Sequence, residues 1–351
     1  FTESSPVYGI KAEYVGMTSV NLTWEVKDTA SKLYTYRIEV ANDTFVMNVT
    51  SRVPKAEITE LIPGTMYSFT VFAVLGDNET EGEGSCISIY TKPSPVFGLK
   101  AEYVDMTSVN LTWEVNDAAS NSYMYRIEVA NDTFVTNVTS RAPKAEITEL
   151  IPGTMYSFTV FAVAADNETE GEGSSISVYT KPSPVYGLEA EYVGVTSVNL
   201  TWEVNDAASD SYTYRIEVAN DTFVTNVTSR VAKAEITELI PGTMYRFTVF
   251  AVAADNETEG EGITKYLYTK PSPVYGLKAE YVDMTSVNLT WEVNDTASKL
   301  YTYRIEVAND TFVTNVTSTV PKADITELIP GTMYSFTVFA VLGDNETEGE
   351  G

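Results

Sequence analysis

The sequence contains no histidine and only one cysteine, Cys86. Without histidine, neither a Ser-His-Asp nor a Cys-His catalytic arrangement can form. A single cysteine excludes an intramolecular disulfide. Cys86 aligns with the polar residues Ser175 and Thr264, so we expect its side chain to point outward. Its role stays open between an unpaired thiol and a thiol that pairs with a second molecule.

Basic residues and long apolar runs are also scarce. The chain has 22 Lys and Arg against 49 Asp and Glu, which gives a formal net charge of -27. This balance argues against nucleic acid, which needs clustered basic side chains. It argues equally against contact with an anionic membrane surface. No apolar run approaches the length of a transmembrane helix.

What the sequence does contain is one module repeated four times. The segment from Leu61 to Tyr67 returns as 150–156, 239–245 and 328–334, each time 89 residues further on. A unit of this length can bury its own core, so each repeat is expected to fold as a separate domain. The predicted boundaries are 1–94, 95–183, 184–272 and an incomplete 273–351, with residues 1–5 the end of a preceding repeat or a leader.

Within each repeat, short runs alternate between apolar and polar residues. Residues 18–24 place Val20, Leu22 and Trp24 on one face, and no helical period occurs anywhere. Pro63 and Gly64 make a sharp turn, after which Tyr67 can bury its ring and bond its hydroxyl to the upstream backbone. The pattern predicts an all-β chain of four seven-stranded antiparallel immunoglobulin-like sandwiches. The predicted structural core residues are Trp24, Tyr67, Trp113, Tyr156, Trp202, Tyr245, Trp291 and Tyr334.

These features together resemble a fibronectin type III domain, four times over. The resemblance rests on the tryptophan of the second strand, the Leu-x-Pro-Gly-Thr-x-Tyr corner, the missing disulfide and the exit segment 90–93. Segments 34–38, 58–61 and 69–73, with Asp77, are similar to the ectodomain repeats of receptor-type tyrosine phosphatases that carry long glycosylated arrays. One departure is Lys265, which stands where Ile87 should point inward and puts the register of that strand in doubt.

The recurrent chemical motif is the glycosylation sequon Asn-x-Ser/Thr. Each sequon lies at a predicted loop or outward position, so an attached glycan would project into solvent. The pattern predicts a secreted or cell-surface glycoprotein with N-linked glycans and no other cofactor. The candidate sites are Asn21, Asn42, Asn48, Asn78, Asn110, Asn131, Asn137, Asn167, Asn199, Asn220, Asn226, Asn256, Asn288, Asn294, Asn309, Asn315 and Asn345.

The loop 77–84 carries acidic residues at alternate positions. Oxygen-rich loops can bind calcium, but this spacing is not that of an EF-hand. We therefore interpret the loop as a solvated one and predict no metal site. No Arg-Gly-Asp sequence occurs, so the loop offers no support for integrin binding by that motif.

A phenylalanine recurs on the outward side of the strand that begins at the corner tyrosine. An arginine such as Arg37 on the neighbouring strand could stack over this ring as a cation–π pair. The ring is then either covered locally or available as a lateral contact. The four candidates are Phe72, Phe161, Phe250 and Phe339.

Two functions fit these observations. The first is a non-catalytic, glycosylated spacer, adhesion or ligand-binding ectodomain of a cell-surface receptor, any catalytic domain lying outside this segment. The second is a secreted structural fibre built from near-identical repeats, possibly assembled by strand complementation. Both place the chain outside the cell, with protein or glycan partners or self-association, and without nucleic acid or direct membrane contact.

The fourth repeat stops before its last strand, since Gly351 aligns with Gly262. The strand from Tyr334 to Val341 would then have an unpaired edge. Three outcomes stay open: the missing strand lies outside the sequence at hand, another chain supplies it, or the repeat is loose. The surroundings of Phe339 and Val341 would distinguish them.

Overall fold

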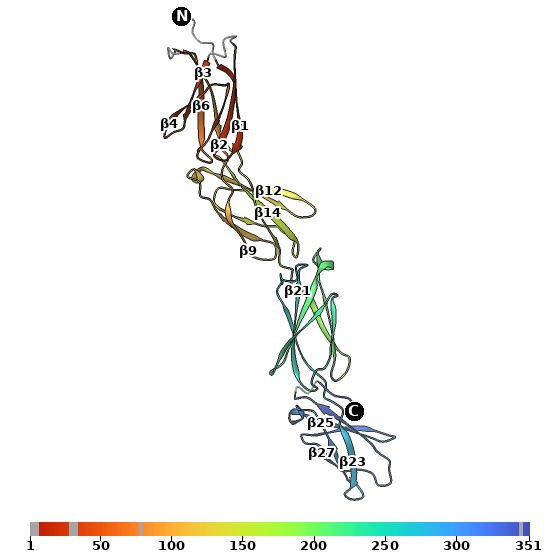
Figure 1. The fold of residues 1–351 in the computed structure, drawn as a ribbon. Helices are drawn as coiled ribbons and strands as arrows, with labels where there is room; N and C mark the ends of the chain where they lie inside the picture. The colour runs from red at the N-terminus through yellow and green to blue at the C-terminus, as the bar shows by residue number, and fades with distance from the viewer. Residues whose placement is uncertain (1–6, 28–33, 77–79, 344–346) are drawn as a thin grey trace. The chain divides into compact units, whose positions relative to one another are not determined.

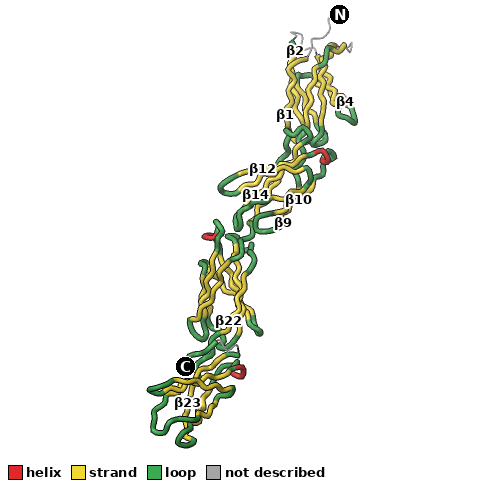
Figure 2. The backbone as a smooth tube through the Cα atoms, turned by 180° about the vertical axis from the view of Figure 1, so that it is seen from behind, coloured by secondary structure: helices red, strands yellow, loops and turns green. Residues whose placement is uncertain are grey.

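The computed structural model describes residues 7–27, 34–76, 80–343 and 347–351. The chain divides into two compact units, Phe1–Leu150 with Thr154–Thr180 and Ile151–Gly153 with Lys181–Gly351. Strands dominate the described residues (Figures 1 and 2). Short 3-10 segments lie at Ser120–Ser122, Ser209–Ser211 and Ser298–Leu300. The predicted all-β class is confirmed.

The first repeat is a sandwich of two antiparallel sheets. One sheet has the order β1-β2-β5, and the other has the order β4-β3-β6 with β7 and β8 both paired to β6. The strands are β1 Val7–Gly16, β2 Ser19–Val26, β3 Tyr34–Ala41, β4 Val46–Ser51, β5 Lys55–Ile58, β6 Met66–Leu75, β7 Thr80–Glu81 and β8 Ser85–Tyr90.

The second and third repeats use the same two sheets. In the second, β13-β10-β9 faces β12-β11-β14-β15. Its strands are β9 Phe97–Tyr103, β10 Val109–Glu114, β11 Met124–Ala130, β12 Val135–Ser140, β13 Lys144–Ile147, β14 Met155–Val163 and β15 Ser174–Tyr179. The third has β16 Tyr186–Tyr192, β17 Val198–Glu203, β18 Thr213–Ala219, β19 Val224–Ser229, β20 Lys233–Ile236, β21 Met244–Val252 and β22 Ile263–Tyr268. Both repeats have the seven strands that the sequence predicts.

The described part of the fourth repeat holds six strands, in the sheets β23-β24-β27 and β26-β25-β28. They are β23 Tyr275–Tyr281, β24 Val287–Glu292, β25 Thr302–Ala308, β26 Val313–Ser318, β27 Lys322–Ile325 and β28 Ser335–Val341. β28 pairs with β25 along one edge. Its other edge makes the single bridge Val341–Glu348 among the described residues. Supply of a strand by another chain therefore stays a prediction.

The alternation along the strands builds the core of each repeat. In the first, Val20, Leu22 and Ile38 are fully buried, and Trp24 is 4% exposed. The Trp24 ring lies edge-on to Tyr36, with 5.2 Å between the ring centroids. Because strand side chains point to opposite faces in turn, one polar residue separates each buried pair. The same tryptophan–tyrosine contact recurs at Trp113, Trp202 and Trp291.

The corner tyrosine makes the contact that the sequence predicts. The Ile62 amide donates a hydrogen bond to the Tyr67 hydroxyl over 3.0 Å. The same bond recurs in the third and fourth repeats, from Ile240 to Tyr245 and from Ile329 to Tyr334. Tyr67 is fully buried, and its ring stacks on Phe69. The hydroxyl thus ties the strand β6 to the turn that precedes it.

The structure differs from the sequence interpretation in one loop, and it resolves the register of the last strand of the third repeat. The segment 77–84 was predicted to be a loop, but it contains β7, which pairs with the end of β6. The register of β22 is unchanged, because Lys265 pairs with Phe247 just as Ile87 pairs with Phe69. Lys265 is exposed where Ile87 is half-buried, since its aliphatic stem can carry the charged end to solvent.

Candidate glycosylation and contact surfaces

The sequons fall into groups by their place in the fold. The first group lies in the turn between the third and fourth strands of each repeat. There the side-chain oxygen of Asn42 accepts bonds from the Thr44 amide, the Thr44 hydroxyl and the Phe45 amide over 2.9–3.0 Å. This is an Asx turn built from the asparagine and threonine of the sequon itself. The amide nitrogen that would carry a glycan takes no part in these bonds.

The second group lies on the fourth strand, an edge strand of its sheet. The side-chain oxygen of Asn48 accepts a hydrogen bond from Arg37 Nη1 over 2.8 Å. A guanidinium is donor-only, so this contact fixes which end of the amide faces the arginine. The nitrogen of the exposed Asn48 is left for attachment. The equivalent bonds to Asn137, Asn226 and Asn315 are 2.9–3.0 Å long.

The third group lies on the second strand, facing outward between buried residues. Asn21, Asn110 and Asn199 are exposed there, as predicted. Asn288 is half-buried, and its side-chain oxygen is buried without a hydrogen-bond partner among the described residues. The structure offers no physical reason for this difference. Among the sequons of this strand, Asn288 is therefore the one least open to a glycan.

The remaining sequons among the described residues lie in loops. Asn167 and Asn256 are exposed and adopt left-handed backbone conformations, with φ of 60° and 59°. Asparagine tolerates this region better than most residues do. Asn294 is also exposed, whereas Asn78 and Asn345 lie outside the described residues.

The four candidate phenylalanines each lie beneath an arginine. The Arg37 guanidinium carbon is 4.1 Å from the centroid of the Phe72 ring, and the other three repeats give 3.9–4.0 Å. The predicted cation–π pair is therefore present in every repeat. Each ring is half-buried, and a glycine of the following loop, such as Gly84, packs against its edge. These rings are covered locally, which leaves a reduced area for a lateral contact.

A carboxylate completes this cluster, and sequence reasoning missed it. In the second repeat, Arg126 Nε and Nη2 donate to the two oxygens of Glu170 over 2.6 and 2.9 Å. Paired bonds of this kind hold a guanidinium in a fixed plane. In the first repeat the hydrogen bond from Arg37 lowers the pKa of Glu81, and the same bond raises the pKa of Arg37. The sequence does contain a signal for this ion pair, because the arginine and the glutamate recur with the same spacing in all four repeats.

Replacing Arg126 with alanine tests the cluster. The substitution removes the cation–π contact and the paired bonds to Glu170, and it uncovers Phe161. Since the pair is partly exposed, we expect the second repeat to lose only about 1–2 kcal/mol of unfolding free energy. Urea denaturation measures the loss. The exposed Arg141 is the matched control, and Arg141→Ala should change stability by less than about 0.5 kcal/mol. Equal effects of the two substitutions would contradict the role of the cluster.

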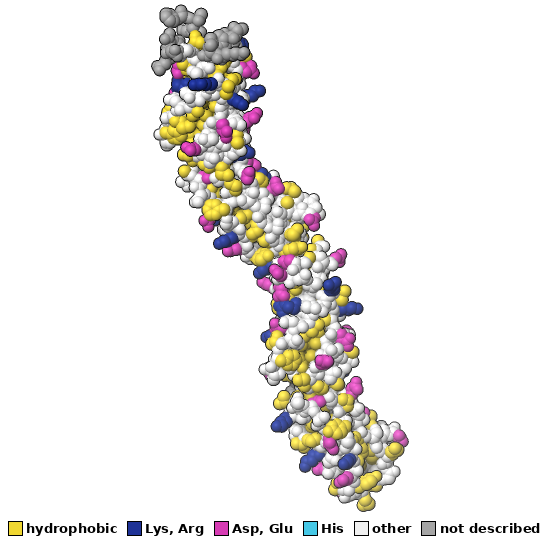
Figure 3. Space-filling view, in the orientation of Figure 1, with side chains coloured by type: hydrophobic (Ala, Val, Ile, Leu, Met, Phe, Trp, Pro, Cys, Tyr) yellow, Lys and Arg dark blue, Asp and Glu magenta, His cyan; other side chains and the backbone are white. Residues whose placement is uncertain are grey.

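The other candidate sites have less structural support as functional sites. Cys86 is free and exposed, as predicted, with its sulfur 3.1 Å from the Ser68 hydroxyl. Among the residues that the structure describes, no group of three or more Cys, Asp or Glu could hold a metal ion. The same residues include no helix long and apolar enough to cross a membrane. On the face shown in Figure 3, acidic side chains are scattered over the repeats and gather in no single patch.

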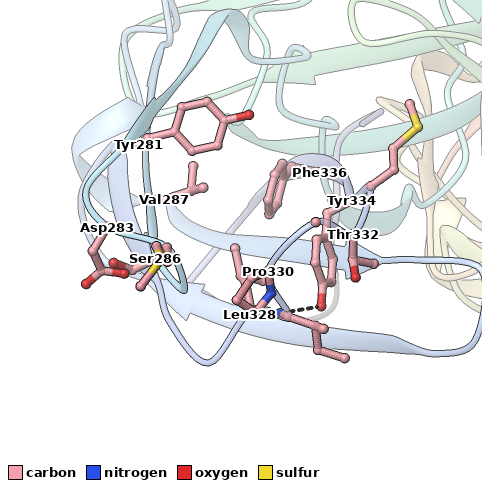
Figure 4. Close-up of a pocket in the computed structure, with 13 residues that line it drawn as sticks. Tyr281, Asp283, Ser286, Val287, Leu328, Pro330, Thr332, Tyr334 and Phe336 are labelled. Atoms are coloured by element: carbon pink, nitrogen blue, oxygen red, sulfur yellow. Dashed lines mark hydrogen bonds between the residues drawn. The ribbon is translucent and has the colours of Figure 1, made fainter.

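A recess of about 460 Å³ opens in the fourth repeat, beside Tyr281, Tyr334 and Phe336 (Figure 4). In the first repeat the residues equivalent to these lie against the final strand: Tyr67 pairs with Ile89, and the Tyr14 hydroxyl donates to the Tyr90 carbonyl. Tyr281 is 91% exposed, against 40% for Tyr14. The recess therefore occupies the position that the final strand fills elsewhere, and we assign no ligand to it.

Comparison with known proteins agrees with this geometry. The sequence model of the family "Fibronectin type III domain" matches residues 5–85, 93–178, 182–264 and 271–350. The chain is 65% identical over its full length to receptor-type tyrosine-protein phosphatase eta of Gallus gallus, and it covers 25% of that protein. It is 29% identical to the protein of the same name from Mus musculus, over 99% of this chain and 28% of that protein. Tenascin of Gallus gallus is 26% identical over 94% of this chain and 19% of its own length.

The chain thus spans less than a third of the length of these relatives. The family matches account for all four repeats, and the fibronectin type III domain is a non-catalytic domain. Since the relatives are extracellular or cell-surface proteins, the chain is an extracellular array of such repeats.

Proposed function

Since this chain belongs to the fibronectin type III family, we propose that it is a glycosylated spacer and adhesion segment in the ectodomain of a cell-surface receptor. The observation that carries the proposal is the 65% identity to a receptor-type phosphatase over all 351 residues. The outward sequons support it, because they leave the two-sheet cores free of sugar. The role is physical: the repeats hold the outer part of a receptor away from the cell and offer protein or glycan partners a polar, negatively charged surface.

The sequence of the full-length precursor tests the receptor assignment. We expect one transmembrane helix after the repeats, followed by a cytoplasmic domain. A secreted precursor without a membrane anchor would contradict the assignment and favour the extracellular fibre.

Glycan occupancy is a separate expected result. Treating the native protein with peptide-N-glycosidase converts each glycosylated asparagine to aspartate, which mass spectrometry detects. We expect conversion at most sequons, with Asn42 and Asn48 modified because their amide nitrogens are free of the bonds that hold their oxygens. Among the four sequons of the second strands, we expect the lowest occupancy at Asn288, whose side-chain oxygen is buried. Unmodified asparagine at most sites would contradict the glycosylated array, whereas the receptor assignment would stand or fall on the precursor.

A further inference from the structure

The Pro-Gly corner of one repeat lies against a tyrosine of the next repeat in the same compact unit. In the first unit, a Cβ atom at Gly64 would overlap the hydroxyl group of Tyr123. In the second unit, a Cβ atom at Gly242 would overlap the Tyr301 hydroxyl in the same way. Both tyrosines are buried, at 4% and 3% exposure. Only glycine leaves room for so close an approach.

An aspartate holds this tyrosine and the linker together. The Tyr123 hydroxyl donates to Asp117 Oδ2 over 2.7 Å, and the Ser94 amide donates to the same oxygen over 2.8 Å. In the second unit both bonds recur at 2.8 Å, from Tyr301 and from the Ser272 amide to Asp295. Hydrogen bonds to an ionised carboxylate are stronger than bonds between neutral groups. The linker amide and the docked tyrosine thus share one charged acceptor.

Further contacts hold the linker to the repeats on both sides of it. Before it, the Thr91 hydroxyl donates to the Ile62 carbonyl over 2.6 Å, which ties the end of the first repeat to its own corner. After it, Gly171 of the second repeat packs so closely on the Pro93 carbonyl that a Cβ atom there would collide with it. Gly349 and Pro271 make the equivalent contact in the second unit. The segment between the two repeats is thus fixed to both of them.

We propose that the Pro-Gly corner is a docking site for the Asp-to-Tyr segment of the following fibronectin repeat, residues 117–123 in the first unit and 295–301 in the second. Docking couples the two repeats, so the linker does not act as a free hinge. Part of the second repeat's protection against local unfolding and amide exchange therefore comes from the first repeat. The proposal concerns contacts inside each unit and does not depend on the receptor assignment.

The fourth repeat supplies a matched control. Gly331 is the equivalent of Gly64, with φ of 76° against 62°, and no atom lies within 4 Å of a Cβ atom there. Alanine at either position meets the same left-handed strain in its own repeat. At Gly64 alone it also displaces a tyrosine of the next repeat. Comparing Gly64→Ala with Gly331→Ala therefore separates docking from local strain.

The experiment is amide hydrogen exchange on the complete chain, read at the peptide that contains Ser94. Pro93 and Pro95 have no amide, so Ser94 reports the linker bond directly. We expect Gly64→Ala to raise exchange at Ser94 by about tenfold or more, and Gly331→Ala to leave it unchanged. Asp117→Ala should raise it similarly, with the exposed Asp132→Ala as its control. Unchanged exchange at Ser94 in both Gly64→Ala and Asp117→Ala, or an equal rise in the Gly331→Ala control, would overturn the proposal.

Discussion

Replacing Trp24 with alanine will lower the unfolding free energy of the first repeat by about 3–5 kcal/mol, the usual cost of emptying a large aromatic core position. Trp24 is 4% exposed and packs on Tyr36 between the two sheets. Its ring nitrogen has no hydrogen-bond partner among the described residues, so the loss comes from packing and from the cavity that remains. A loss of this size is comparable to the whole stability of a small domain.

Circular dichroism and fluorescence together measure this loss during urea denaturation. The chain has four tryptophans, one in each repeat, so in Trp24→Ala the fluorescence reports only the other three. We expect circular dichroism to show that one repeat unfolds at a lower urea concentration. The fluorescence transition should shift only slightly, by the stability that the second repeat loses when the first repeat, on which it docks, is unfolded. Trp24→Phe keeps most of the volume and should cost less than about 1.5 kcal/mol. A common shift of all four repeats would show that they do not fold as separate domains.

Raising the pH above 10 will destabilise the second, third and fourth repeats through their buried tyrosines. Burial, and then the hydrogen bond to Asp117, raise the pKa of Tyr123, and Tyr212 and Tyr301 are raised by the same causes. Burial also raises the pKa of Tyr125. A raised folded pKa stabilises the protein fully below the unfolded value of about 10, and this stabilisation is lost as the pH rises. Each such tyrosine costs up to about 1.4 kcal/mol per pH unit between that value and its own folded pKa.

Urea denaturation at pH 8, 10, 11 and 12 measures the effect. We expect the second repeat to lose about 1.4 kcal/mol per pH unit above pH 10 through Tyr123. Tyr125 adds to this loss until the pH reaches its own folded pKa. Tyr125→Phe removes one ionisable group and should reduce the slope for that repeat, which separates the effect from general charge repulsion. A stability that stays flat up to pH 12 would contradict the burial of these hydroxyl groups.

The sequence predicted the parts of the fold that depend on one repeat alone. Alternation placed Trp24 and Leu22 inside, and the turn before Tyr67 predicted the bond to the upstream backbone. The cation–π pair of Arg37 and Phe72 followed from two outward positions on neighbouring strands. These contacts depend on strand period and register, which a sequence carries directly.

What the sequence did not show are contacts across repeat boundaries and within irregular loops. The role of Asp117 is one example, because only one of its two hydrogen-bond partners, Tyr123, lies in its own repeat. Its other partner, the Ser94 amide, belongs to the linker, and the corner glycine belongs to the preceding repeat. The two-residue strand β7 has no periodicity to detect. A search for residues that recur together, such as the aspartate, the tyrosine and the glycine, could have found the docking site.

The identical register of the four repeats has a consequence for refolding. The pairing between the third and the corner strand is the same in all of them, as shown by Ile38 with Val71 and Ile127 with Val160. A strand of one repeat therefore fits the equivalent place in its neighbour, so two unfolded neighbours can exchange strands and become trapped in a misfolded pair. Synthesis from the N-terminus avoids this competition, because each repeat can close before the next is complete. Refolding from denaturant releases all four at once and offers no such order.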